Sequence, residues 1–391
     1  MASEIYLDNS ATTRICPEAL RRYIEVAEGC YGNPSSLHAL GFAAEGVIKE
    51  SERTVLRSVR AKDARVIFTS SGSEANNLAI IGRAYAKERY RRGCKIISFL
   101  GEHASVNEPC ERLKHEGYTV EYLPTVGGRI DLDGLRSALD SSVILVSCMM
   151  VNNETGAIYD LPAISKIIRE KSPDALFHVD ATQGYMKIPF SLDALGADAV
   201  TLSSHKIEGP KGVGALVVNQ SVLKSKGLSP IVYGGGQQAG LRSGTENVPG
   251  IAAFAEAVKV NMNQLTSRIE NLKALRDKLI SELSAREELR EISPTLPPIH
   301  APHILNLTLP GIKSETMLHF LSSLGIFVSS GSACSSNTGH TSSALTAYGR
   351  SAAEADTSIR VSFGAGNTEG DVDALCHGLA QGLAKLSRIK K

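Results

Sequence analysis

From residue 65 onward, short β-rich apolar runs alternate with helical stretches, and this alternation restricts the fold more than any other feature. The predicted strands are Arg65–Thr69, Lys95–Leu100, Thr119–Leu123, Val143–Val151, Leu176–Val179 and Ala199–Leu202, with Gly212–Asn219 as a last strand and a candidate for an antiparallel one. Helical periodicity covers Glu74–Arg91, Val106–His115 and Pro162–Lys171. Apolar strands that alternate with helices are typical of a parallel sheet covered on both faces. The sequence therefore predicts an α/β fold with a mostly parallel seven-stranded sheet.

The composition changes after Gly234-Gly235-Gly236 and Pro249-Gly250, and a second, smaller unit is expected beyond this point. Residues 251–286 carry one long amphipathic helical pattern, which we interpret as a solvated helix that joins two domains. Further strand patterns cover His303–Leu309 and Ile359–Phe363, and further helical patterns cover Ser314–Leu324 and Asp371–Leu386. We expect a large domain over residues 15–250 and a small α+β domain over residues 251–391.

The bulk properties exclude several classes of protein. Lys and Arg total 42 and Asp and Glu total 41, so the net charge of +1 gives no reason to expect binding to nucleic acid or to an anionic membrane. No run approaches the roughly 20 apolar residues of a spanning helix, and the start Met1–Glu4 lacks the pattern of a secretory signal. The 7 cysteines are scattered without Cys-x-x-Cys spacing, so we expect no metal site, no disulfide framework and a reducing cytoplasm.

A lysine and an aspartate indicate one cofactor chemistry. Lys206 follows Ser203-Ser204-His205 and precedes the turn Glu208–Gly212, a setting that suits a Schiff base with an aldehyde cofactor beside a phosphate pocket. Asp180 ends the apolar strand Leu176–Val179, where a carboxylate keeps a pyridine nitrogen protonated. Either residue alone also fits a structural role, as a surface lysine or a loop-capping aspartate. Together they favour pyridoxal 5'-phosphate.

Two further segments suit the binding of anions. Ser70–Glu74 follows a predicted strand and begins a helix, so its free amides and the helix dipole suit a phosphate. The same residues also fit an ordinary helix N-terminus without a ligand. Arg360 lies inside the alternating run Ser358–Phe363. A guanidinium there can hold a substrate α-carboxylate through two parallel hydrogen bonds, and a salt-bridged strand arginine is the alternative.

Cys334 differs from the other cysteines in its surroundings. It lies in Ser329–Gly339, a run of Ser, Gly, Ala, Asn and Thr that is typical of a polar loop. An exposed loop cysteine can act as a thiolate nucleophile. Cys148, within a predicted strand, fits an inert buried residue instead.

These motifs occur together in a known family. The chain resembles the cysteine desulfurases of the iron–sulfur-assembly and nitrogen-fixation type, within the class V pyridoxal-phosphate-dependent aminotransferases. The matching segments run almost end to end and are Tyr6–Thr13, Gly32–Ser36, Phe68–Asn77, Val151–Glu154, Arg242–Asn247, Ser329–Cys334 and Ser358–Ser362. The resemblance implies fold-type I of the pyridoxal phosphate enzymes, a segment 1–14 that returns to the small domain, and a homodimer with its active site between subunits.

The resemblance also implies a role for each site residue. The catalytic residues are Lys206, Cys334 and His103, the last of which stacks on the pyridine ring and moves protons. The cofactor is bound by Gly72, Ser73, Asn153, Asp180, Gln183, Ser203, His205 and Lys206, with Thr245 reaching the phosphate from the partner subunit. The substrate carboxylate is held by Asn33, Asn153 and Arg360. From the residues alone, Asn153 equally fits a turn and His103 an ordinary loop.

The expected reaction converts L-cysteine to L-alanine and passes the sulfur, as a persulfide on Cys334, to an acceptor protein for iron–sulfur cluster assembly or for thiolation of tRNA or a cofactor. The alternatives are a selenocysteine lyase, a class V aminotransferase, which needs no loop thiol, and a non-catalytic sulfur carrier. The acceptor stays open for two reasons. The chain ends at Ser387–Lys391 soon after its last predicted helix, whereas well-known relatives carry a further tail, and Ser335–Thr341 differs from the relatives' acidic, proline-containing loop.

Overall fold

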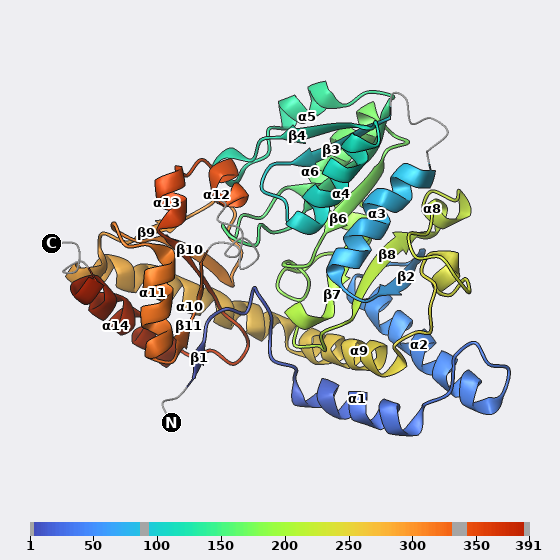
Figure 1. Cartoon of the computed structure of the whole chain (residues 1–391), viewed down its shortest axis with the longest axis horizontal. Helices are drawn as coiled ribbons and strands as arrows, with labels where there is room; N and C mark the ends of the chain where they lie inside the picture. The colour runs from blue at the N-terminus through green and yellow to red at the C-terminus, as the bar shows by residue number, and fades with distance from the viewer. Residues whose placement is uncertain (1–3, 87–93, 331–341, 387–391) are drawn as a thin grey trace.

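The computed structural model describes residues 4–86, 94–330 and 342–386, which form two units side by side (Figure 1). The larger unit is built on a seven-stranded sheet of order β2-β8-β7-β6-β5-β3-β4. Its strands are β2 (Ala64–Thr69), β3 (Lys95–Phe99), β4 (Thr119–Leu123), β5 (Val143–Met149), β6 (Leu176–Asp180), β7 (Ala199–Ser203) and β8 (Gly214–Asn219). Strand β8 runs antiparallel to β7 and β2, and the remaining pairings of this sheet are parallel. The predicted mostly parallel seven-stranded α/β sheet is confirmed.

The central strands are mostly apolar because helices cover both faces of the sheet. In β5, Val146 and Cys148 contact one core and Leu145 contacts the other. On the first face lie α1 (Pro17–Gly29), α2 (Ala39–Ser58), α5 (Leu132–Ala138), α6 (Leu161–Lys171) and α7 (Leu192–Leu195); on the second lie α3 (Gly72–Ala86), α4 (Ala104–His115) and α8 (Gln220–Lys224). Two buried faces remove the alternation of apolar and polar residues that a half-exposed strand would show.

The smaller unit has an antiparallel four-stranded sheet of order β12-β13-β10-β9. Its strands are β9 (Ser293–Thr295), β10 (Ile304–Thr308), β12 (Ser329–Ser330) and β13 (Ser358–Ser362), and its helices include α11 (Ser314–Ser323), α12 (Ser343–Tyr348), α13 (Ala352–Asp356) and α14 (Glu369–Leu386). A separate apolar core lies between this sheet and helices α11 and α14. The unit therefore buries its own hydrophobic surface.

The N-terminal segment is part of the smaller unit. Strand β1 (Ile5–Tyr6) pairs in parallel with β11 (Ile326–Phe327), and Leu7 is fully buried in the core of that unit. The blue β1 accordingly lies among the orange and red elements in Figure 1. The chain then crosses to the larger unit, where the Thr13 amide donates to the His205 carbonyl oxygen at 2.9 Å. Residues 9–13 thus run between the two units.

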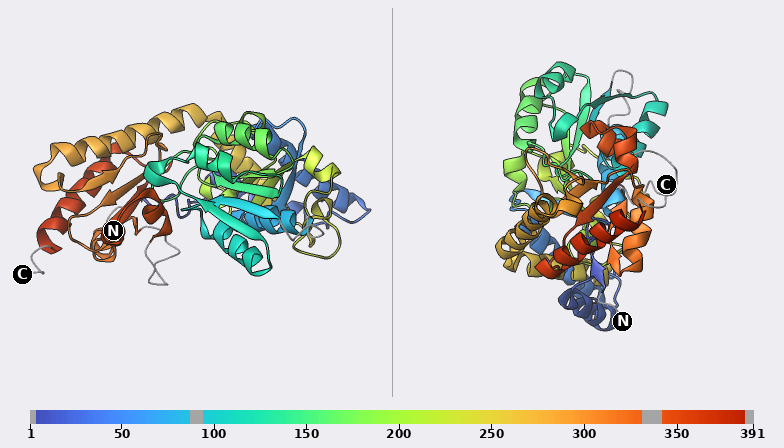
Figure 2. Two further views of the ribbon diagram at one scale, coloured as in Figure 1. Left: turned by 90° about the horizontal axis from the view of Figure 1, so that it is seen from above. Right: turned by 90° about the vertical axis from the view of Figure 1, so that its left-hand side faces the viewer.

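Residues 251–286 do not form one solvated helix, so that interpretation of the pattern is wrong. Helix α9 (Val248–Asn263) and helix α10 (Leu265–Ala285) meet at Gln264 and follow one another along one side of the molecule (Figure 2). Phe254 and Val258 of α9 are fully buried in the larger core, and α10 buries a row of leucines in the smaller one. We therefore propose that the division between the domains lies at Gln264, where the expectation placed it after residue 250.

Within residues 4–86, 94–330 and 342–386, no helix has both the length and the apolar composition that crossing a membrane requires.

Candidate active site

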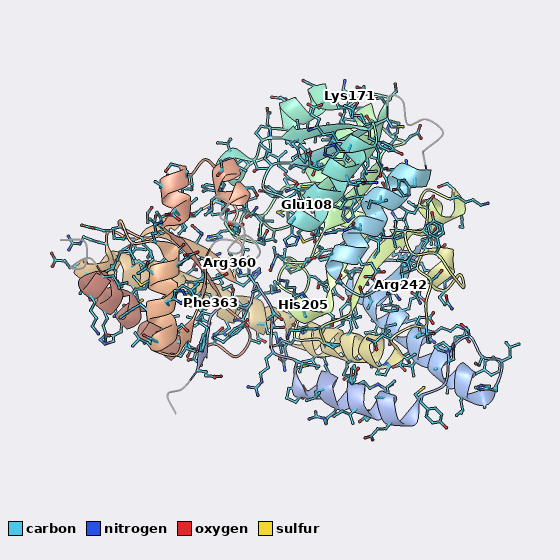
Figure 3. All side chains as sticks on the ribbon, in the orientation of Figure 1. Glu108, Lys171, His205, Arg242, Arg360 and Phe363 are labelled. Atoms are coloured by element: carbon cyan, nitrogen blue, oxygen red, sulfur yellow. The ribbon has the colours of Figure 1, made fainter. Side chains whose placement is uncertain are left out.

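A cavity of about 270 Å³ lies where the carboxyl ends of the parallel strands meet the N-terminal segment and β13. Open α/β sheets commonly bind ligands at this edge. The predicted site residues that line the cavity are Gly72, Ser73, His103, Asn153, Asp180, Gln183, Ser203, His205, Lys206 and Arg360. The fold thus brings together residues from both units, and Figure 3 shows His205 and Arg360 at their junction.

Three predicted residues are not among those that line the cavity. Asn33 and Thr245 are exposed on loops of the larger unit. Within this one chain they do not line the cavity. Cys334 lies outside the described residues.

Lys206 is held at the floor of the cavity by main-chain oxygens. Its Nζ donates to the carbonyl oxygens of Ser10 and Ala11 at 2.5 and 2.7 Å. Its own carbonyl oxygen accepts from Nζ of Lys187 at 2.8 Å. Lys187 is buried, and this burial, with the nearby charge of Lys206, lowers the pKa of Lys187 from 10.5 to about 7. One lysine therefore presents its amine to the cavity while a second one holds the main chain behind it.

Asp180 is connected to His103 through two neutral side chains. Nδ2 of Asn76 lies 2.8 Å from Oδ2 of Asp180 and 2.8 Å from Oγ of Ser105. The Ser105 oxygen in turn lies 2.8 Å from Nδ1 of His103. The main-chain amide of Thr182 donates to Oδ1 of Asp180 at 2.9 Å. These contacts orient the carboxylate at the end of β6.

His103 enters the cavity as a neutral ring. Burial lowers the pKa of His103, and the positive charges of Lys206 and Arg360 lower it further, although Asp180 opposes the shift. The amide of Ser105 donates to Nδ1 at 3.1 Å, so Nδ1 is an acceptor and the proton of the neutral ring is on Nε2. His103 therefore presents a hydrogen-bond donor, its Nε2–H, at neutral pH.

The opposite end of the cavity suits an anion. Gly72 begins α3, and a Cβ placed on Gly72 would lie 3.2 Å from Cβ of Ser203 and 3.2 Å from Oγ1 of Thr182. The absence of a side chain leaves room for a group against the helix N-terminus, where free amides favour a phosphate. His205 also borders this space, and its burial, with nearby lysine charges, lowers its pKa to about 4, so its ring is neutral.

Arg360 closes the cavity from the smaller unit. It is buried, with Nη1 donating to the Asn153 carbonyl oxygen and Nη2 to Oδ1 of Asp8, both at 2.9 Å. Its Nε has no hydrogen-bond partner among the described residues. Burial raises the pKa of Asp8, and the charge of Arg360 opposes this rise. A buried guanidinium with a donor to spare is suited to bind a carboxylate.

A comparison with known proteins places the chain in a family. The family model described as "Aminotransferase class-V" matches residues 5–375. The chain belongs to the class-V aminotransferase family. Among its relatives is the "Cysteine desulfurase IscS" of Dictyoglomus turgidum, to which the chain is 36% identical over 391 residues. This match covers 100% of this chain and 97% of the relative.

Solved structures agree with this class-V assignment. A structure titled "NIFS-LIKE PROTEIN" matches with a TM-score of 0.88 and 33% identity over 98% of this chain and 100% of the other. A structure titled "SspA in complex with cysteine" matches with a TM-score of 0.78 and 28% identity over 92% of this chain and 99% of the other. The expected fold of a class-V enzyme is thereby shown.

Several residues of this class-V site were not predicted from the sequence to act in it. Asn76 and Asp8 lie inside two of the segments that match the family, Phe68–Asn77 and Tyr6–Thr13. A polar residue at a buried helix position, such as Asn76, is a usable signal, because buried amides are usually hydrogen-bonded. Ser105 carries no such signal, since a serine at the start of a helix is common.

Proposed function

We propose that the chain is a pyridoxal-phosphate-dependent cysteine desulfurase that forms L-alanine and transfers the sulfur of L-cysteine to Cys334. The observation that carries this proposal is the meeting of Lys206, Asp180 and Arg360 around one cavity. An amine, an oriented carboxylate and a guanidinium are the groups that a pyridine aldehyde and an amino-acid carboxylate require. The relative named a cysteine desulfurase and the neighbour solved with cysteine support the choice of substrate.

The lining residues fit pyridoxal phosphate. Oε1 of Gln183 is buried and lacks a hydrogen-bond partner among the described residues, so it has an acceptor to offer to a bound group. Gly72, with Ser73, Ser203 and His205, would hold the phosphate, Asp180 the pyridine nitrogen, and Gln183 and Asn153 the phenolic oxygen, while Lys206 would bond to the aldehyde carbon. When bound, the cofactor would supply an electron sink for charge that develops at the substrate α-carbon.

The chain's own residues perform the remaining work. Arg360 binds the substrate carboxylate, with Asn153 beside it, and thereby fixes the orientation of the α-carbon. Lys206 takes the α-proton, and His103 borders the same cavity as a hydrogen-bond donor. The ring of His103 is fixed as a donor because its Nδ1 accepts from the Ser105 amide and its Nε2 carries the hydrogen.

The sulfur step belongs to Cys334. Its thiolate attacks the substrate sulfur, the bond between the substrate sulfur and its β-carbon breaks, and a proton replaces sulfur on that carbon. L-cysteine and the enzyme thiol thus become L-alanine and an enzyme persulfide, without any external oxidant. Cys334 follows Ser330 by four residues, and four residues of extended chain span at most about 14 Å. Since β12 pairs with β13 at Arg360, the reach of this segment starts from the strand next to the one that carries Arg360.

The proposal includes a homodimer in the cytoplasm that passes its persulfide to an acceptor protein. Exposed apolar side chains lie close in sequence to Asn33, with Tyr31 74%, Leu37 90% and Phe42 57% exposed. A neighbouring subunit that covers them would bring Asn33 and Thr245 to a cavity that they do not reach in their own chain. The cysteines within the described residues are all free thiols, which suits a reducing compartment.

The deciding experiment compares the natural chain with Cys334→Ser. With L-cysteine and a reducing thiol, the natural chain should release sulfide and alanine in equal amounts without any keto acid. Cys334→Ser should bind the cofactor and L-cysteine but form neither product, because a serine hydroxyl is hardly ionised and cannot form a persulfide. Cys30→Ser, which replaces a partly exposed free thiol, is the matched control and should be fully active. Equal sulfide release by Cys334→Ser, or a requirement for a keto acid, contradicts the proposal.

A further inference from the structure

The buried carboxyl group of Glu154 contacts Ser342, the residue that precedes helix α12. Oγ of Ser342 donates to Oε2 of Glu154 at 2.5 Å. Glu154 is only 3% exposed, and Ser342 is 8% exposed. Burial raises the pKa of Glu154, although Ser342 and Arg360 oppose this rise. A buried carboxyl group has no water to replace a lost partner, so this contact is costly to break.

Glu154 is itself fixed to the residues that would bind substrate. It follows Asn153, whose carbonyl oxygen accepts from Nη1 of Arg360 at 2.9 Å. Its own amide donates to Oδ1 of Asn152 at 3.0 Å, and Nδ2 of Asn152 donates to the Gly101 carbonyl oxygen at 3.0 Å. Glu154 therefore has little freedom to move independently of the site.

Ser342 is also held in place by the helix that it precedes. Its hydroxyl accepts from the Leu345 amide at 3.1 Å and so caps α12, which lies at the junction of the two units (Figure 1). Helix α12 packs on the turn before His103, since a Cβ built on Gly101 would lie 3.3 Å from Cα of Ala344. At the other end of the intervening chain, Ser329 pairs with Arg360 in the ladder of β12 and β13. Both flanks of residues 331–341 are thus attached to the candidate site.

We propose that Glu154 is a positioning residue that holds Ser342, and with it the C-terminal end of the segment carrying Cys334, against Asn153 and Arg360. This inference rests on the proposed function, because it assumes that Cys334 attacks the substrate sulfur. Closing both ends of a segment on one site removes chain conformations that carry the thiol away from the substrate. The gain is in orientation, which acts on the sulfur-transfer step and leaves cofactor binding unaltered.

The test separates substrate binding from sulfur transfer in Glu154→Ala, Ser342→Ala and Glu154→Gln. Alanine formation in a single turnover should fall about tenfold in both alanine variants, the size expected for one lost buried hydrogen bond. The KM for L-cysteine should stay within about twofold of the natural value. Glu154→Gln should retain most of the rate, because an amide oxygen still accepts from Ser342. Combining Glu154→Ala with Ser342→Ala should add little to either loss.

A second readout does not depend on turnover. The rate at which iodoacetamide alkylates Cys334 without substrate, followed by peptide mass spectrometry, should change by more than about twofold in both alanine variants. The matched control is Ser351→Ala, since Ser351 caps α13 and donates to Oε2 of Glu354 at 2.8 Å on the exposed surface. Ser351→Ala loses the same kind of serine–glutamate contact and should leave the rates of alanine formation and of Cys334 alkylation unchanged.

The outcomes separate this inference from the proposed function. If the natural chain forms no alanine from L-cysteine, the proposed function fails, and the alkylation rates still decide whether Glu154 and Ser342 control the position of Cys334. Unchanged alanine formation and alkylation in both alanine variants would overturn the inference. So would a loss that appears only as a higher KM, or no recovery in Glu154→Gln. Should Glu154→Ala fail to fold, Ser342→Ala keeps the buried carboxyl group and decides the question.

Discussion

Asn76 and Asp180 are joined inside the cavity, with Nδ2 of the amide 2.8 Å from Oδ2 of the carboxylate. The second hydrogen of the same amide nitrogen is directed to Oγ of Ser105 at 2.8 Å. Ser105 contacts His103, so one side chain of α3 orients both the group proposed for the pyridine nitrogen and the histidine that borders the same cavity.

Replacing Asn76 by alanine should weaken cofactor binding. The carboxylate of Asp180 would keep the Thr182 amide but lose its side-chain donor, and a lost hydrogen bond to a charged group costs about 1.5–3 kcal/mol. We expect the Kd for pyridoxal phosphate, measured by absorbance titration, to rise at least tenfold. Asn219→Ala removes an amide contact to the Ala197 carbonyl oxygen at the far end of β8 and is the control. An unchanged Kd for Asn76→Ala would show that Asp180 needs no such support.

Arg360 should matter for substrate and little for the cofactor. Arg360→Lys keeps a positive charge near Asp8 but loses the fork that binds a carboxylate through two hydrogen bonds. We expect the variant to keep its yellow colour while kcat/KM for L-cysteine falls by roughly two to three decades. The measurement is steady-state alanine formation beside the absorption spectrum. Near-normal kcat/KM would mean that the carboxylate is bound elsewhere.

Lys187 should make stability depend on pH. Its pKa is about 7 in the folded chain and 10.5 as the usual value, so between these values the unfolded chain binds a proton that the folded chain does not. The unfavourable contribution of Lys187 to the free energy of unfolding therefore becomes smaller as pH rises from about 7 to 10.5. Below about pH 7 both the folded and the unfolded chain carry this proton, and the full destabilisation by Lys187 is present.

The check is a comparison with Lys187→Met by urea unfolding. The difference in unfolding free energy, natural chain minus variant, should increase between about pH 7 and pH 10. Taking the difference cancels the tyrosines and cysteines that titrate in the same range. A difference that is flat with pH would show that Lys187 is charged in the folded protein.

Thr245 should act in the site of the other subunit. It is exposed and does not line the cavity of its own chain. Thr245→Ala and Lys206→Ala should each lose activity in pure form, whereas a dimer with one subunit of each kind contains one site with both native residues. Mixing the two variants after reversible dissociation should therefore restore activity. No recovery in a verified mixed dimer, or a fully active monomer by sedimentation, would contradict a shared site.

The helices, the strands and the type of sheet can be predicted from residues that lie close together in the chain. Residues Val143–Met149 are apolar except for Ser147, and all are buried, because a parallel strand covered on both faces has no side that faces solvent. The motifs around Lys206 and Asp180 were readable for a similar reason, since reactive groups that follow β-strands meet at one edge of a parallel sheet. These inferences depend on residues that are close in the chain.

The tertiary structure decided which distant residues meet. Asp8 bonds Arg360 across 352 positions, Glu154 bonds Ser342 across 188, and Asn76 bonds Asp180 across 104. The hydrophobic periodicity of a helix or strand indicates which of its faces is buried, but it does not indicate which other element packs against that face. For the same reason the amphipathic pattern of residues 251–286 concealed the change from one core to another at Gln264, because each half buries an apolar face against a different unit.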